Sequence, residues 1–204
     1  SIPTLLSPPL LANKERAHFD KWHVFLADER HVPESDPQSN MGIWRSELLA
    51  DAGVPSVQIY SLDAALPLPE AATAYQTELI AVLGSLPRLD AAVLGMGPDG
   101  HTASLFPDHP LLQEEDSWVA PISDSPKPPS ARITLTLPAL NAAALVLFVV
   151  TGASKAPMVR SAFAPESDVP AGLVLGRGRT HWLLDEPAAA ELMVEQQRLS
   201  HMYG

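Results

Sequence analysis

The chain has 204 residues, of which 46% are hydrophobic and 18% are charged, and its formal net charge at pH 7 is −11. This length suits a single globular domain over residues 1–204, and so acidic a chain is not expected to bind nucleic acid or an anionic membrane, because both need a basic face. The absence of cysteine excludes disulfides, thiolate metal sites and a cysteine nucleophile.

The apolar segments are too short for a membrane span. The longest of them, Ala142 to Val150, falls far below the ~20 residues that cross a bilayer. Residues Ser1 to Leu6 contain no basic region followed by an apolar one, so they do not form a secretory signal. A cytoplasmic protein is therefore predicted.

A short helix and a buried strand are the first elements predicted along the chain. Pro3 favours a helix start, which predicts a helix from Thr4 to Leu11. The near-continuous apolar run Trp22 to Ala27 then predicts a buried parallel strand. That strand delivers the charged triplet Asp28 to Arg30 at its carboxyl end, where ligands bind in open α/β sheets. The alternative is an ordinary solvated strand end.

Helices and strands alternate from there on. Ser39 or Asn40 can cap a helix predicted from Met41 to Leu49, and a longer helix is predicted from Pro69 to Leu83. An apolar run of strand length, Ala91 to Leu94, follows. This alternation predicts an α/β fold with an open, mostly parallel sheet and helices on both faces.

A glycine-rich turn, Gly95 to Gly100, ends the strand at Leu94, and a helix is predicted to follow the turn. Asp99 and His101 would lie at the carboxyl end of the strand, beside backbone amides of the turn. A carboxylate two residues before a histidine favours a positioned acid–base group. The stretch is therefore interpreted as an active-site loop.

Two other interpretations of this loop compete with that one. The stretch from Gly95 to Gly100 spells the dinucleotide-binding pattern GxGxxG, but that pattern needs an acidic residue at the end of the next strand. The acidic residues at the right distance, Glu114 to Asp116, lie in a polar segment instead. The second alternative is a plain glycine turn that carries a surface histidine.

The remaining elements are predicted from proline content and apolar patterning. They are a rigid loop over Pro121 to Pro129, a half-buried strand from Arg132 to Thr136, a buried strand from Leu145 to Val150, a turn over Thr151 to Lys155, a strand from Thr180 to Leu184 and a helix from Glu186 to about Gln197. Lys155 would stand at a helix start, where a cation opposes the helix dipole. It is therefore either exposed or holds an anion.

Four motifs in this order resemble those of the 6-phosphogluconolactonase family, and together they extend over almost the whole chain. They are Asp28-Glu29-Arg30 with Ser39-Asn40, the stretch Gly95 to Pro107 that contains Asp99-Gly100-His101-Thr102-Ala103-Ser104, Ser125-Pro126-Lys127-Pro128-Pro129 with Arg132, and Thr151-Gly152 with Lys155. Glucosamine-6-phosphate deaminases and some sugar-phosphate sensor domains share the fold. Arg30 and the stretch Thr102 to Pro107 follow the lactonase form rather than that of the deaminases.

The resemblance implies a Rossmann-like sheet of the NagB type and hydrolysis of 6-phospho-D-glucono-1,5-lactone to 6-phosphogluconate, the second step of the oxidative pentose phosphate pathway. No cofactor and no metal are expected. The expected ligand is a small sugar-phosphate lactone, and a monomer is expected, with a homodimer as the alternative. The alternative functions are a deaminase-like isomerase and a sensor that binds sugar phosphate without turnover.

The resemblance and the residue chemistry suggest roles for particular side chains. His101 can act as base and then as acid, and either Asp99 or Asp28 could orient it or a substrate hydroxyl. The residues expected to bind substrate are Ser1, Arg30, Gly97, Gly100, Thr102, Lys127, Arg132 and Lys155, with Arg30 and Lys155 the first candidates for the phosphate and Lys127 and Arg132 the next.

One departure from the family pattern concerns the beginning of the chain. The family normally has a strand, a helix and a further strand before a phosphate-binding Ser-Gly-Gly-Ser-x-Pro loop. Ser1-Ile2-Pro3 resembles only the end of that loop. The natural polypeptide is therefore expected to extend upstream of Ser1, with the additional part packed beside the strand that ends at Asp28.

Overall fold

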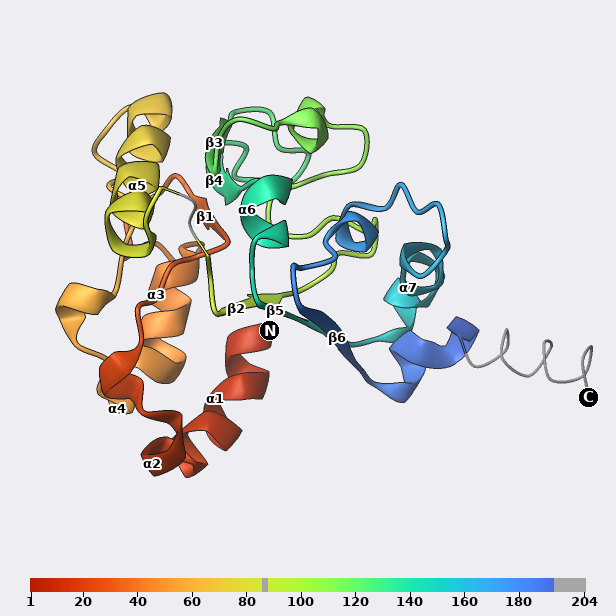
Figure 1. Ribbon diagram of the computed structural model, residues 1–204, viewed down its shortest axis with the longest axis horizontal. Helices are drawn as coiled ribbons and strands as arrows, with labels where there is room; N and C mark the ends of the chain where they lie inside the picture. Colours follow the sequence, from red (N-terminus) through yellow and green to blue (C-terminus); the bar gives the residue numbers. More distant parts are fainter. Residues whose placement is uncertain (86–87, 193–204) are drawn as a thin grey trace, which may run out of the picture. The chain divides into compact units, whose positions relative to one another are not determined.

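The computed structural model describes residues 1–85 and 88–192. It divides into two compact units. Unit 1 consists of Ser1–Pro87 and Val119–Leu135, and unit 2 consists of Arg88–Trp118 and Thr136–Gly204. Each unit contains one three-stranded sheet together with helices, which confirms the predicted α/β class (Figure 1).

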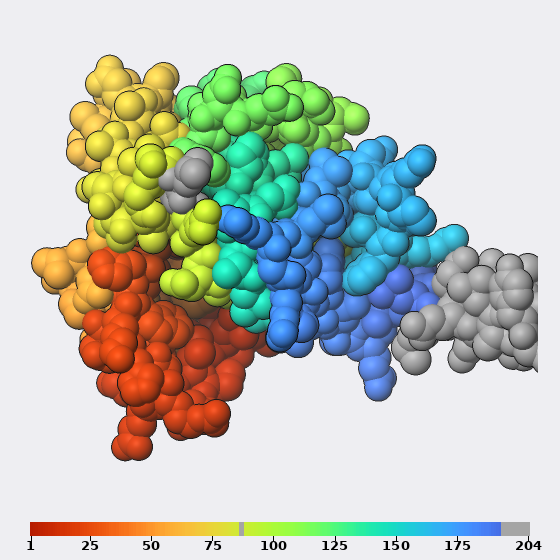
Figure 2. Space-filling model, in the orientation of Figure 1, coloured from red at the N-terminus to blue at the C-terminus, as the bar shows by residue number. Residues whose placement is uncertain are grey.

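Unit 1 is built on an antiparallel sheet. Its strands are β1 (Asp28–Arg30), β3 (Val119–Ile122) and β4 (Arg132–Leu135), in the order β1-β4-β3. Its helices are α1 (Ile2–Ala12), α2 (Lys14–Ala17), α3 (Asn40–Trp44), α4 (Ala50–Ala52) and α5 (Leu68–Leu83), with a π-helical stretch, Arg45–Leu49, that joins α3 to α4. Helix α5 packs against β3 and β4, as the yellow and green segments of Figures 1 and 2 show.

One hydrophobic cluster of unit 1 lies among the helices that precede α5. It contains the buried apolar side chains Phe19, Leu26, Met41, Leu48, Leu49, Ala52 and Val54. Burial of the valine, leucine, methionine and phenylalanine side chains contributes about 1.5–3 kcal/mol each. These contacts fix the start of α3 beside β1, since Met41 is the second residue of α3 and Leu26 lies two residues before β1.

Unit 2 contains the predicted parallel sheet. Strands β2 (Ala91–Leu94), β5 (Leu145–Val150) and β6 (Arg179–Leu184) are all parallel, with β5 in the centre. Helices α6 (Leu137–Asn141) and α7 (Ala156–Ala162) belong to this unit, and residues 186–192 are also helical. The rest of the predicted last helix, up to Gln197, lies outside the described residues. The described segments include no helix that is long and apolar enough to span a membrane.

Several predicted boundaries are confirmed. The predicted helix from Thr4 to Leu11 lies within α1, the helix from Pro69 to Leu83 is α5, and β2 and β5 have the predicted bounds. Ser39 caps α3 as predicted, because its hydroxyl accepts a hydrogen bond from the Gly42 N–H.

The parallel strand predicted over Trp22 to Ala27 is wrong for most of its length. Only Asp28–Arg30 forms a strand, and it pairs with β4 in antiparallel orientation. Val24 makes a single parallel bridge with Ile59. The Leu26 N–H donates to the Tyr75 hydroxyl at 2.6 Å, and this hydroxyl donates to the Leu26 carbonyl at 3.3 Å. The Tyr75 hydroxyl of α5 thus forms hydrogen bonds with the Leu26 N–H and carbonyl, which would otherwise pair with a neighbouring strand.

The helix predicted after the glycine turn is also wrong. Thr102 and Leu105 instead close a turn through reciprocal backbone hydrogen bonds of 3.3 and 2.9 Å. Ala103 has a φ of 48°, which a right-handed helix does not allow. The segment after β2 therefore forms no helix through Leu105.

The proline-rich region differs from its prediction in two ways. Strand β3 includes Pro121, which was predicted to belong to the rigid loop Pro121 to Pro129. Pro121 is tolerated there because β3 is at the edge of its sheet. Strand β4 was predicted as half-buried, but all four of its residues are buried.

Candidate active site

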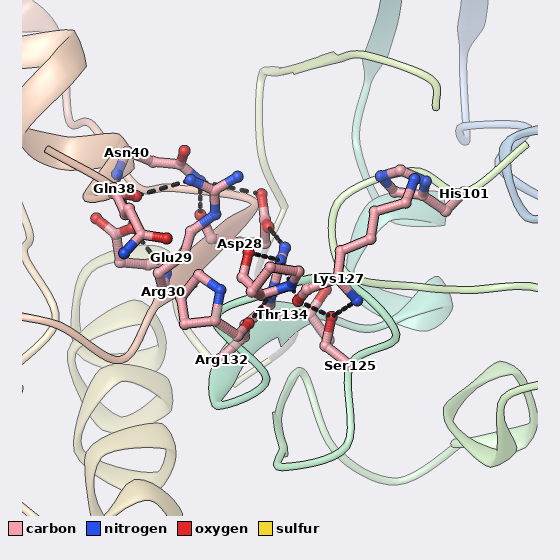
Figure 3. Close-up of polar contacts among 12 residues, drawn as sticks. Asp28, Glu29, Arg30, Gln38, Asn40, His101, Ser125, Lys127, Arg132 and Thr134 are labelled. Atoms are coloured by element: carbon pink, nitrogen blue, oxygen red, sulfur yellow. Dashed lines mark hydrogen bonds and ion pairs between the residues drawn. The ribbon is translucent and has the colours of Figure 1, made fainter. Parts of the chain in front are cut away.

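The antiparallel pair β1–β4 places four polar side chains on one face of its sheet. Asp28 lies opposite Thr134, and Arg30 lies opposite Arg132. Residues directly opposite in an antiparallel pair share a face, and side chains alternate along a strand. Asp28, Arg30, Arg132 and Thr134 therefore share a face, and Glu29 points to the other one (Figure 3).

This face concentrates positive charge. Arg30 and Arg132 are like charges at opposed positions, an arrangement that destabilises a sheet unless an anion is near. The pKa of Arg132 is lowered, first by burial and then by the charge of Arg30, while Asp28 opposes the shift with an oxygen 3.9 Å from Nη1 of Arg132. In the part of the chain that is described, the Arg30 Nε is buried without a hydrogen-bond partner. Such a donor suits the oxygen of an anionic ligand.

Arg132 also holds the proline-rich loop. Its side chain is 4% exposed. Its Nε donates to the Pro129 carbonyl at 2.8 Å, and its Nη2 donates to the carbonyls of Lys127 at 2.8 Å and Pro128 at 3.2 Å. The Ser125 hydroxyl donates to the Lys127 carbonyl at 3.0 Å. Arg132, which was expected to bind substrate, thus directs donors to the backbone that carries Lys127.

In unit 2, the glycine turn brings Asp99 against His101. The Gly97 N–H donates to the His101 carbonyl at 2.9 Å, and the Gly100 N–H donates to the Gly97 carbonyl at 3.0 Å. Gly100 has a φ of 84°, which favours glycine. In this closed turn Asp99 Oδ1 lies 2.5 Å from His101 Nδ1. Of the two carboxylates that were expected to orient His101, Asp99 therefore contacts it.

The turn has no room for a side chain at Gly97. A Cβ atom at this position would overlap the imidazole of His101 and approach the carboxylate of Asp99. The backbone amides of the turn were expected to lie beside a ligand. The N–H groups of Gly97 and Gly100 donate within the turn, rather than being reserved for a ligand.

His101 has the surroundings of a positioned acid–base group. Its ring stacks on Phe106 with centroids 4.7 Å apart, and its side chain keeps 18% exposure. The contact with Asp99 fixes the ring through Nδ1. A histidine held in this way can accept a proton from water and return it to a leaving group.

The other expected residues lie at identifiable places. Thr102 is buried and its hydroxyl donates to the Gly95 carbonyl at 2.8 Å, which makes it part of the loop. Ser1 is the N-cap of α1, and its hydroxyl lies 2.8 Å from that of Thr4. Lys155 is the N-cap of α7, as predicted, and is half-buried.

Two carboxylates that were not predicted as functional hold the segments that carry Lys155, Asp28 and Arg30. Asp185 accepts the Gly152 N–H at 3.0 Å on both oxygens and the Ala188 N–H at 2.9 Å, so it fixes the loop before Lys155. Glu29 is 2% exposed, and burial raises its pKa, although four hydrogen bonds oppose the shift. The sequence of the triplet Asp28 to Arg30 predicted a charged strand end, but it did not indicate that the Glu29 side chain is buried.

The expected residues are thus distributed over both units. Unit 1 carries Ser1, Asp28, Arg30, Lys127 and Arg132, and unit 2 carries Gly97, Asp99, Gly100, His101, Thr102 and Lys155. Within the described segments, no three His, Asp or Glu side chains meet as a metal site would require. The fold and the side chains define an α/β protein with an aspartate–histidine pair in unit 2 and a cationic strand face in unit 1.

The chain belongs to the family of glucosamine-6-phosphate isomerases/6-phosphogluconolactonases, whose model matches residues 1–182. It is similar to the 6-phosphogluconolactonase of Homo sapiens, with 44% identity over 198 residues that cover 95% of this chain and 77% of the human protein. Among solved structures, 6-phosphogluconolactonase from Thermotoga maritima has a TM-score of 0.75 and 32% identity, over 86% of this chain and 80% of that one. The corresponding enzyme from Trypanosoma brucei has a TM-score of 0.76 and 29% identity, over 90% and 77%.

Proposed function

We propose that this protein hydrolyses 6-phospho-D-glucono-1,5-lactone to 6-phosphogluconate in the oxidative pentose phosphate pathway. The observation that carries the proposal is the Asp99–His101 pair at 2.5 Å, in a chain whose curated relative at 44% identity is a 6-phosphogluconolactonase. Opening a lactone needs a base for water and an acid for the leaving oxygen. One oriented histidine supplies both.

In the proposed reaction, His101 Nε2 takes a proton from water as the water oxygen bonds to the lactone carbonyl carbon. The carbonyl oxygen carries the negative charge of the tetrahedral intermediate. When the carbonyl is restored, the bond from that carbon to the ring oxygen breaks, and His101 returns the proton to the ring oxygen. Asp99 keeps the imidazole in the required tautomer and stabilises its charged form.

The phosphate is assigned to the cationic groups. Arg30 is the first candidate, because its guanidinium offers a planar fork and its Nε is buried and unpartnered among the described residues. Lys127 and Lys155 supply further positive charge. Because Asp99 already contacts His101, Asp28 is assigned to a substrate hydroxyl. The Arg132 guanidinium is assigned to holding the loop of Lys127.

The proposal includes a monomeric enzyme in the cytoplasm with no nucleic-acid or membrane partner. The net charge of −11 supports the last point. Sedimentation velocity at micromolar concentration tests the oligomeric state, and a dimer would contradict that part alone.

Two parallel assays test the reaction. Acid release is measured on freshly prepared 6-phosphogluconolactone, with spontaneous hydrolysis subtracted, and ammonia release is measured on glucosamine 6-phosphate. Acid release that depends on enzyme concentration, without ammonia release, is the expected result. Ammonia without acid would make the protein a deaminase, and tight binding of 6-phosphogluconate without either product would make it a sensor.

A further inference from the structure

Glu29 occupies an unusual position for a carboxylate. It lies in the middle of β1, between Asp28 and Arg30, and its side chain points away from the face that those two residues share. It is among the largest fully buried side chains, with 2% exposure. A buried carboxylate is costly unless hydrogen bonds or charges compensate it.

Four donors surround the Glu29 carboxylate, two on each oxygen. Oε1 accepts the N–H groups of Arg30 at 2.7 Å and Asn40 at 2.8 Å, and Oε2 accepts the Ser39 hydroxyl at 2.9 Å and the Met41 N–H at 2.8 Å. Asn40 and Met41 begin α3, where backbone N–H groups lack partners within the helix. Glu29 therefore joins β1 to the beginning of α3.

Three hydrogen bonds connect this junction to residues of the cationic face. The Asn40 side-chain amide donates to the Asp28 carbonyl at 2.9 Å and lies 3.4 Å from its carboxylate. The Arg30 Nη1 donates to the Gln38 carbonyl at 2.7 Å (Figure 3). The segment 38–40 thus contacts both Asp28 and Arg30 on one face of β1, while Glu29 holds that segment from the other.

We propose that Glu29 is a positioning residue for substrate binding, which fixes Asp28 and the Arg30 guanidinium by holding the start of α3 against β1. The proposal rests on the function proposed above, in which Arg30 binds the phosphate. Glu29 itself does not touch the substrate. Its effect passes through the backbone of β1 and through Gln38 and Asn40.

Replacement Glu29→Gln tests this role. The amide keeps the shape of the carboxylate. Its NH₂ group, however, would face two hydrogen-bond donors that now donate to a carboxylate oxygen. We expect KM for 6-phosphogluconolactone to rise about tenfold, and the dissociation constant of 6-phosphogluconate to rise in parallel, because both depend on the placement of Arg30. We expect kcat per folded molecule to stay within about threefold, because the Asp99–His101 pair is unchanged.

Glu34→Gln is the matched control. Glu34 is also a carboxylate of unit 1 that accepts hydrogen bonds from side chains, but neither Glu34 nor its partners Arg45 and Ser61 lie in β1 or in the segment 38–40 that contacts Asp28 and Arg30. Its replacement should lower the unfolding midpoint and leave KM unchanged. If Glu29→Gln behaves in the same way as Glu34→Gln, the positioning role is refuted and Glu29 only stabilises the fold.

Ser39→Ala covers the case in which Glu29→Gln does not fold. It removes one of the four donors and leaves the three backbone donors in place. We expect a twofold to fourfold rise in KM, and a KM equal to that of the unaltered protein would overturn the proposal.

If the unaltered chain lacks lactonase turnover, the proposed function fails. Calorimetric affinity for inorganic phosphate then decides the positioning role, with weaker binding by Glu29→Gln than by Glu34→Gln in its favour and equal binding against it.

Discussion

The charged face of unit 1 and the histidine loop of unit 2 hold their side chains by different means. On β1 and β4 the strand register fixes which residues meet, and Asp28, Arg30 and Arg132 share a face because of side-chain alternation. In the loop, Asp99 reaches His101 because Gly97 has no side chain in the way. Replacement of Asp28 or Arg30 should therefore leave the strand register in place, whereas the loop should fail when a single methyl group is added at Gly97.

The largest expected effect is that of His101→Ala. Removal of the group proposed to transfer the proton should lower kcat by about 10²–10⁴-fold, with little change in the affinity for 6-phosphogluconate. Steady-state acid release and product-binding calorimetry measure the two quantities. A variant that keeps kcat and loses only affinity would show that His101 binds substrate rather than moving a proton.

Gly97→Ala should have the next largest effect. The added methyl group would overlap the imidazole of His101, so the ring must leave its position against Asp99. We expect kcat to fall by about 10–10²-fold, since small misplacements of catalytic groups are this costly.

Gly178→Ala provides the steric control for this prediction. Its methyl group would crowd the Ala144 carbonyl, directly before β5 and β6 begin, at the opposite end of the parallel sheet from the histidine loop. It should lower the unfolding midpoint without lowering kcat per folded molecule. Equal loss of kcat in the two variants would mean that the loop is sensitive to global destabilisation rather than to the position of His101.

Arg30→Ala should act on binding. Loss of a charge-assisted contact of about 1.5–3 kcal/mol corresponds to a rise in KM of about 10–100-fold, with kcat nearly unchanged, because phosphate is held alike in the ground and transition states. Arg160→Ala is the control, since Arg160 is an exposed arginine 3.9 Å from Glu191. An unchanged KM for Arg30→Ala would move the phosphate to other cations, with Lys127 and Lys155 the next to replace.

The smallest predicted effect concerns pH and Glu34. Its pKa is lowered, first by the hydrogen bond from Arg45, while burial opposes the shift. The folded-state pKa thus lies below the unfolded value, so the contribution to stability is present above the unfolded pKa and is lost as pH falls through the folded one. Because the Glu34 side chain is 37% exposed, solvent screening limits this contribution to about 1 kcal/mol or less.

Urea unfolding of the natural sequence and of Glu34→Gln at pH 7 and pH 3 measures that contribution. The difference in the free energy of unfolding between the two proteins should shrink at pH 3. A difference that grows toward low pH would mean that folding raises the Glu34 pKa instead of lowering it.

The sequence predicted those parts of the structure that depend on neighbouring residues. Ser39 as a cap, strand β2 and the glycine turn with Asp99 and His101 follow from local patterns, and the structure contains them. The turn that replaces the expected helix depends on a positive φ at Ala103, which is not predicted from an alanine in the sequence.

Features that depend on distant residues were missed. The antiparallel pairing of β1 with β4 joins segments far apart in the chain, and strand β3 contains a proline that normally argues against a strand. Arg132 looked like a ligand for phosphate because its charge is visible in sequence, but its contacts with the loop carbonyls are not. The inward direction of Glu29 likewise depends on where α3 begins.

A double-mutant cycle on His101→Ala and Arg30→Ala tests most directly whether proton transfer and phosphate binding are separate tasks. The quantity is kcat/KM for 6-phosphogluconolactone in the unaltered protein, both single variants and the double variant. The two losses are expected to multiply, with a coupling energy within about 0.5 kcal/mol of zero, as for independent sites. A double variant no worse than His101→Ala alone would contradict this separation, because the two residues would then act as one catalytic unit.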